Sequence, residues 1–135
     1  PLATWADGNG IFQTKFDFSR DTTYIVGAYC SGSIMPEHDI RVTMELATDS
    51  LASAKQASAA IRAYDLLPES AYTVEPASLE CTIRRGTERG DLLVTFHTSQ
   101  LDADKKYILP LRIRSVSEYE IAPRYNTLFF GITKR

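Results

Sequence analysis

Cysteine, histidine and tryptophan are scarce in this chain of 135 residues, which has two cysteines, two histidines and one tryptophan. The cysteines, Cys30 and Cys81, are too few and too far apart for a zinc site or a Cys-x-x-Cys redox motif. Both fall on the apolar side of a predicted strand, which favours two buried thiols that act as small hydrophobes. The alternative is one disulfide across the fold, which would suit an exported protein.

An excess of charge of one sign is also absent, because 15 basic residues stand against 17 acidic ones and both kinds are scattered along the chain. This balance argues against nucleic acid, and against an anionic membrane surface, as the main partner. No apolar run approaches the roughly 20 residues of a membrane-spanning helix. The segment after Pro1 lacks the features of an export signal, so we expect a mature or trimmed product whose link to a membrane is a lipid anchor outside this sequence.

Catalytic motifs are missing as well. His38 and His97 are far apart and belong to no metal-ligand spacing, and both are expected to be solvated surface residues. The sequence contains no Gly-x-Ser-x-Gly elbow and no cysteine-protease signature, although a triad can assemble from distant residues. We therefore expect no enzyme activity and no cofactor.

Two acidic patterns deserve the same test. Glu118 and Glu120 are two residues apart near a strand end, and this spacing favours a charged rim over the carboxylate pair of a glycosidase. The run Asp7-Gly8-Asn9-Gly10 lacks the alternating oxygen ligands and closing glutamate of a calcium loop. Neither pattern predicts a catalytic or metal-binding residue.

What the sequence does contain is strict alternation of apolar and polar residues. In Ile40–Leu46, for example, Ile40, Val42 and Met44 share one side while Arg41 and Thr43 share the other. The predicted strands are 11–18, 22–31, 40–46, 72–74, 79–84, 92–97, 107–115 and 128–132. Seven or eight strands with one wet face predict an all-β antiparallel β-sandwich, in a single domain over residues 1–135.

One segment interrupts the strands. In residues 49–67 apolar side chains recur every three or four positions among several alanines, which predicts a short helical insertion. Ser50 is a candidate for its N-cap, and Pro68 marks where the helix has already ended.

Several short motifs follow one another along the chain in a characteristic order. The strand at Asp39-Ile40-Arg41-Val42 is followed by Tyr64-Asp65-Leu66-Leu67-Pro68 and Ala71-Tyr72-Thr73-Val74, then by an Ile-x-x-Gly hairpin at 83–86 and by Lys106-Tyr107-Ile108-Leu109-Pro110-Leu111-Arg112-Ile113. From near Tyr24 to near Phe130, this pattern resembles the Bacteroidetes-type domain of unknown function found at the N-terminus of many surface lipoproteins.

The resemblance implies an immunoglobulin-like sandwich that lies outside the cell beside the outer membrane. Such domains often precede a chitinase-like glycoside hydrolase, or a laminin-G-like or discoidin-like sugar-binding domain. The family offers no catalytic residues to carry over to this chain. We therefore expect a non-catalytic accessory or adhesion domain of an outer-membrane lipoprotein that takes part in glycan capture, with the periplasm as the alternative location.

The motif positions also have structural interpretations. Pro110 falls inside a predicted strand, where proline is tolerated only on an edge or at a bulge, so we expect one of these at that point. Tyr64, Tyr72 and Tyr107 are expected to bury their rings and to give each hydroxyl a partner, as a tyrosine corner does.

Aromatic residues outside the core pattern are the remaining candidates for a binding site. Each of them is more typical of packing or of a rim than of ligand contact: Trp5, Tyr29, Tyr119, Tyr125 and Phe129. As possible glycan contacts we single out Trp5, Tyr119 and Tyr125. Two alternative functions stay open, namely direct carbohydrate binding through exposed aromatics and a protein-interaction or pilus-like module that lends an edge strand to a neighbour. The chain itself is expected to be a monomer.

Overall fold

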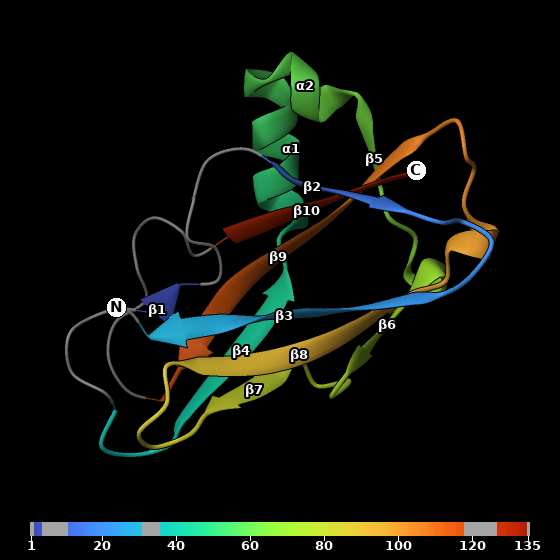
Figure 1. Cartoon of the computed structure of the whole chain (residues 1–135). Coiled ribbons are helices and arrows are strands. Elements are labelled where there is room, and N and C mark those ends of the chain that lie inside the picture. Colours follow the sequence, from blue (N-terminus) through green and yellow to red (C-terminus); the bar gives the residue numbers. More distant parts are fainter. Residues whose placement is uncertain (1, 4–10, 31–35, 118–126, 135) are drawn as a thin grey trace.

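Two facing β-sheets account for most of the computed structural model, which describes residues 2–3, 11–30, 36–117 and 127–134 (Figure 1). The four-stranded sheet has the order β1 (Leu2–Ala3), β3 (Thr22–Cys30), β8 (Arg89–Phe96), β6 (Tyr72–Glu75). The six-stranded sheet has the order β2 (Ile11–Phe16), β10 (Thr127–Lys134), β9 (Lys106–Val116), β4 (Ile40–Leu46), β7 (Glu80–Ile83), and β5 (Tyr64–Leu66) pairs with β9 outside this path. The predicted all-β sandwich with a short helical insertion is confirmed.

The strand series differs from the prediction in two respects. The described residues include two strands that the alternation missed, β1 and β5, because runs of two and three residues are too short to show a period. Not every pair is antiparallel either, since β2 runs parallel to β10 and β5 runs parallel to β9. The other strands begin and end within a few residues of their predicted limits.

The side chains follow the predicted alternation closely. In β4, Ile40, Val42 and Met44 are buried while Arg41 between them is exposed. In β8 the same code buries Leu92 and leaves its neighbour Leu93 exposed. The inward residues of both sheets form one hydrophobic core, as a two-layer fold requires.

Four aromatic rings occupy the centre of that core. Phe96 and Phe130 come from opposite sheets and stack with their ring centroids 5.2 Å apart. Phe16 lies 5.3 Å from Phe96, and Tyr24 meets Phe130 edge-on at 5.0 Å. Such pairs contribute about 1 kcal/mol each beyond their burial, so this cluster joins the two sheets.

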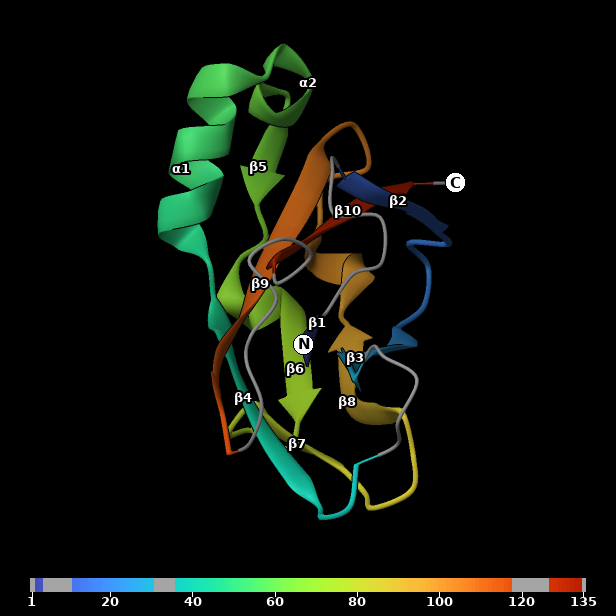
Figure 2. The ribbon, with the colours of Figure 1, turned by 90° about the vertical axis from the view of Figure 1, so that its left-hand side faces the viewer.

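The helical insertion lies at one end of the sandwich (Figure 2). It consists of α1 (Thr48–Ala57) and α2 (Ala59–Arg62), which confirms a short, partly helical insertion within 49–67. Ser58 separates the two with φ −135° and ψ 121°, and its hydroxyl accepts a hydrogen bond from Ile61 N–H at 3.4 Å. Leu51 and Ile61 then pack with Tyr64 and Ile108 in a second, smaller cluster.

Ser50 does not cap the insertion. The N-cap is Ala47, which has no side chain able to cap, and Ser50 lies inside the first turn. Its hydroxyl accepts a hydrogen bond from Arg112 instead. None of the helices in the described ranges is long and apolar enough to cross a membrane.

Pro110 is neither on an edge nor at a bulge, so that prediction is wrong. It lies in β9, which has β10 on one side and β4 and β5 on the other, and the register shift of the β4–β9 pair occurs elsewhere, between Thr43 and Met44. The carbonyl of Pro110 accepts a hydrogen bond from Ala47 N–H, at the point where β4 ends. The backbone nitrogen and carbonyl of one strand residue face the same side of the strand. The nitrogen of Pro110, which carries no hydrogen to donate, therefore faces the gap between β4 and β5.

The tyrosine prediction holds best at Tyr107. Its ring is buried, and its hydroxyl accepts a hydrogen bond from the backbone N–H of Asp102 at 2.9 Å. Tyr64 is also buried, with the ammonium of Lys106 5.6 Å from its ring centroid. Tyr72 is only half-buried.

The cysteine question is decided at Cys81, which is a free, buried thiol and not half of a disulfide. Burial raises the pKa of this thiol above its ordinary value. Cys30 ends β3, but its side chain lies outside the described residues.

Candidate functional site

A polar hollow lies on the outer face of the six-stranded sheet, where β4, β7 and β9 run near one another. Its larger part has a volume of about 530 Å³ and is lined by Asp39, Arg41, Thr82 and Ser117. An adjoining part of about 330 Å³ is lined by Arg41, Thr43, Glu80, Ser115, Val116 and Ser117. Arg41 and Ser117 belong to both parts, so the two form one continuous surface.

Strand register brings these side chains together. Arg41 in β4 lies opposite Thr82 in β7, and Thr43 lies opposite both Glu80 in β7 and Ser115 in β9. Since alternate residues of a strand share a face, the polar side of each strand points into the hollow.

A bulge shapes the β9 side of the hollow. Thr43 pairs with Ser115 while Met44 pairs with Ile113, so Arg114 has no partner on β4. Such an extra residue bends the strand and increases its twist. Beyond it the chain is held to β4, because Arg41 N–H donates to Ser117 Oγ at 2.9 Å and Ser117 N–H donates to the carbonyl of Arg41 at 3.0 Å.

The chemistry of the hollow is that of hydroxyl groups with charges of both signs. Arg41 supplies a guanidinium, Glu80 and Asp39 supply carboxylates, and the lining threonines and serines supply hydroxyls. Asp39 is fixed in place, since one of its oxygens accepts the backbone N–H of Arg85 at 2.7 Å. Such a surface can donate hydrogen bonds to a polyhydroxylated ligand and accept them from it. Within the described ranges no group of acidic, histidine or cysteine side chains could hold a metal ion.

A neighbouring ion cluster on the same sheet has a structural role. Arg112 donates to Glu45 Oε1 at 2.8 Å, to Asp49 Oδ2 at 3.1 Å and to Ser50 Oγ at 2.9 Å. The hydrogen bond from Arg112 lowers the pKa of Asp49, and the bonds to Asp49 and Glu45 raise the pKa of Arg112. These contacts fasten the first turn of α1 to β9 and β4.

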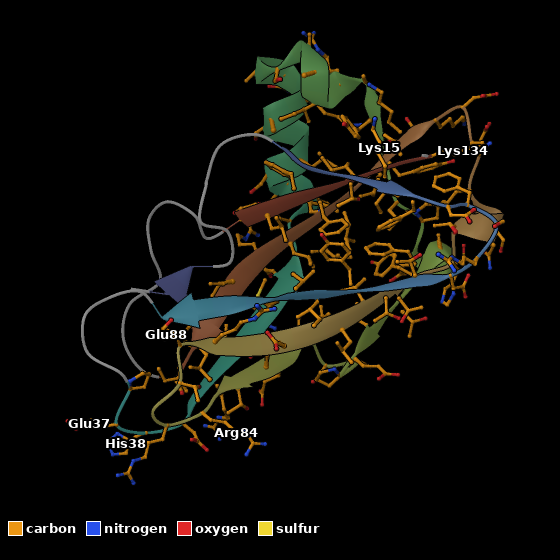
Figure 3. The ribbon with its side chains drawn as sticks, viewed as in Figure 1. Lys15, Glu37, His38, Arg84, Glu88 and Lys134 are labelled. Carbon is orange, nitrogen blue, oxygen red and sulfur yellow. The ribbon has the colours of Figure 1, made fainter. Side chains whose placement is uncertain are left out.

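The two histidines have different surroundings. His38 is exposed, as predicted, in a loop at one end of the sandwich near Glu37 and Arg84 (Figure 3). His97 is not simply solvated. Its Nδ1 lies 2.8 Å from Asp21 Oδ2, and its Nε2 lies 2.8 Å from Thr73 Oγ1.

A carboxylate, an imidazole and a hydroxyl are linked in the order seen in a catalytic triad, through Asp21, His97 and Thr73. Their positions in the fold, however, indicate a structural link between chain segments. Thr73 is in the middle of β6, where its own N–H faces β8 and the N–H of Val74 points the opposite way, to the open edge of β6. No pair of donors therefore converges on the hydroxyl among the residues the structure describes. The histidine ties the β2–β3 turn and β6 to the end of β8.

The residues predicted to contact glycan cannot be placed relative to this hollow. Trp5, Tyr119 and Tyr125 lie outside the described residues, as do Glu118, Glu120 and residues 7–10. Tyr29 is part of β3, but its side chain is likewise not described. Phe129 is partly buried against the cluster beneath the helices, so it serves packing.

Sequence reasoning missed the hollow, although a signal for it was present. The alternate polar residues of β4 and β7 predict a solvent-exposed face of the sheet. The sequence pattern of such a face is the same whether the face is flat or concave. The decisive features, the bulge beside Arg114 and the pairing of β4 with both β7 and β9, depend on strand order.

A family model of an N-terminal domain matches residues 6–120, which is most of the chain. The chain belongs to this family. The resemblance to a Bacteroidetes-type N-terminal domain of unknown function is thereby confirmed. None of the curated proteins matches the sequence.

Several solved structures from Bacteroides share the fold of this chain. An auxiliary nutrient binding protein from Bacteroides thetaiotaomicron shares 21% identity at a TM-score of 0.75, over 96% of this chain and 45% of its own. A protein from Bacteroides ovatus, provisionally described as carbohydrate binding, shares 17% at 0.66, over 98% of this chain and 36% of its own. EndoBT-3987 from Bacteroides thetaiotaomicron, solved with a Man5GlcNAc product, shares 17% at 0.66, over 83% and 26%. The chain thus spans less than half the length of each of these structures.

Proposed function

We propose that this chain is a non-catalytic accessory domain of a cell-surface protein in a glycan-capture system, exported and held at the outer membrane by a lipid anchor outside these residues. The observation that carries the proposal is the shared fold, which makes up only a part of a nutrient-binding protein and of a structure solved with a glycan product. A module that accompanies different activities is not itself the source of any one of them. Its role is to hold or present a neighbour.

The polar clusters of the chain support this proposal. Arg112 fastens the helical insertion, and His97 fastens a turn and an edge strand, so both serve the fold. Among the described residues, the polar hollow and the open edge of β6 remain for a partner.

The experiment is deletion of the segment that encodes residues 1–135 from its gene in the source organism. We expect slower growth on the cognate polysaccharide and unchanged growth on its monosaccharide, because capture fails while metabolism is intact. Protease treatment of whole cells, with an epitope tag in the chain, tests surface exposure. Unchanged growth on every polysaccharide, or a tag protected in intact cells, would overturn the proposal.

The polar hollow favours a second candidate, direct glycan binding. Its hydroxyl groups, guanidinium and carboxylates are the groups that hydrogen-bond sugars, and they gather on one concave surface. Calorimetric titration with a mannan, a xylan and a polyuronate tests this candidate. Removal of a charged hydrogen-bond partner costs about 1.5–3 kcal/mol, so Arg41→Ala should weaken binding by tenfold or more.

The controls separate the hollow from other surfaces. Lys15 lies toward the opposite end of the sandwich (Figure 3), so Lys15→Ala should leave binding unchanged. Trp5→Ala and Tyr125→Ala test the aromatic candidates of the sequence. Flat heats with every polysaccharide would remove direct glycan binding and leave the accessory role standing.

A further inference from the structure

The two sheets leave a groove along one side of the sandwich. β6 is the last strand of the four-stranded sheet, and in the six-stranded sheet β7 pairs with β4 only over residues 40–43 of β4 (Figure 2). Beyond residue 43, Met44 N–H donates to the carbonyl of Leu79 at 2.8 Å, and between this segment and the open edge of β6 lies a groove of about 310 Å³. It is lined mainly by apolar residues, namely Leu46, Glu69, Tyr72, Thr73, Val74, Ala77 and Leu79.

The main chain of β6 presents hydrogen-bonding groups at the groove side. His97 N–H donates to the carbonyl of Ala71 at 2.7 Å, so Ala71 faces β8 and, by alternation, Thr73 does too. The main-chain groups of Tyr72 and Val74 therefore point away from the sheet. The N–H of Tyr72 is used by the carbonyl of Glu69, which leaves the carbonyl of Tyr72 and both groups of Val74 at the edge.

The groove side is also acidic. Glu69 lines the groove and Glu75 ends β6, and neither carboxylate forms an ion pair with a described residue. Burial, and then the charge of Glu69, raise the pKa of Tyr72. A strand added beside β6 would thus meet one unpaired carboxylate at each end of it.

We propose that this groove binds an extended, basic peptide segment of another protein, which adds to β6 as a further strand. The three free main-chain groups supply its hydrogen bonds, and alternate apolar side chains of the segment pack on Tyr72 and Leu79. One basic residue of the segment lies near Glu69, just before β6, and another lies near Glu75, at its end. This peptide site is separate from the polar hollow, which lies on the outer face of the other sheet.

Charge disfavours a second copy of this chain as the occupant. Two β6 strands paired edge to edge would bring the carboxylates of Glu69 and Glu75 from both copies along one short ladder. Like charges on neighbouring strands are destabilising. A basic partner instead gains at the same positions.

The test is titration of the isotope-labelled chain with the peptide acetyl-Lys-Val-Thr-Val-Lys-Val-amide, followed by amide NMR. We expect shift changes centred on Val74 and Ala77, and slower hydrogen exchange at the Val74 amide. Two further peptides carry N-methyl groups, one at the odd-numbered residues and the other at the even-numbered residues. A strand presents its N–H groups alternately to its two edges, so only one of the two peptides should bind.

The charge argument has its own variant. Glu69→Lys with Glu75→Lys should weaken the peptide roughly fivefold, since each exposed ion pair contributes up to about 1 kcal/mol. Glu37→Lys with Glu88→Lys, at exposed positions away from β6 (Figure 3), is the matched control and should change nothing. Absence of shifts at Val74 with millimolar peptide, equal binding of both N-methylated versions, or dimerisation of the chain through β6 would overturn the proposal.

Discussion

His97 and Asp21, which are 76 positions apart in the chain, are joined by a contact of 2.8 Å between Nδ1 and Oδ2. The other ring nitrogen contacts Thr73 at the same distance, so one side chain links three elements. We expect His97→Ala to lower the free energy of unfolding by about 1–2 kcal/mol, because two partly exposed hydrogen bonds are lost. Urea unfolding measures this.

The matched control for that substitution is Lys105→Ala, at an exposed position just before β9. It should shift the unfolding free energy by less than about 0.5 kcal/mol. Equal effects of the two substitutions would show that the tether contributes nothing.

Gly27→Ala should be far more damaging. A Cβ at Gly27 would lie 1.9 Å from the carbonyl oxygen of Gly90, in the backbone of the adjacent strand β8, so β3 and β8 would have to separate. We expect a loss of more than about 3 kcal/mol, or failure to fold, measured by urea unfolding. Gly86→Ala is the comparison: it has open space but a φ of +76°, and should cost about 1 kcal/mol. The reverse order of the two effects would contradict the close approach of these strands.

Cys81 should be unreactive in the folded chain. Its thiol is buried and burial raises its pKa, so little of the reactive thiolate forms or is reached at pH 8. In a Cys30→Ala background, we expect slow reaction with a chromogenic disulfide reagent in buffer and fast reaction in urea. Fast reaction in buffer would mean that the core is open at β7.

The Arg112 cluster predicts a pH dependence. Arg112 lowers the pKa of Asp49 in the folded chain from its ordinary value of 3.8, so the stabilisation by the Asp49 carboxylate is present above that value. It is lost as the pH falls through the lowered folded pKa. We therefore expect Asp49→Asn to lower the thermal midpoint at pH 6, and the difference from the parent chain to shrink below about pH 4. A difference independent of pH would mean that Asp49 acts through helix capping alone.

Much of this fold could be predicted because its strands have one wet and one buried face. The limits of β4 were predicted to the residue, since Ile40, Val42 and Met44 alternate with polar neighbours throughout. Tyr107 also behaved as predicted, because a buried ring with a hydroxyl needs a partner nearby.

The errors have a common physical origin, which is strand order. Pro110 suggested an edge, yet its missing donor faces the short gap between β4 and β5, a gap that exists only because two strands share one side of β9. His97 occupies a polar position, and only the turn that brings Asp21 beside it makes it a tether. The polar hollow likewise depends on which strands lie beside β4.

The most direct test of the accessory role is a search for catalysis. The purified chain is incubated with host and dietary glycans, and released ends are counted by mass spectrometry, in parallel with an Asp39→Asn, Glu80→Gln variant of the polar hollow. The account predicts no release above buffer for either protein. Turnover by the parent chain that the double variant loses would contradict it, because the hollow would then be an active site.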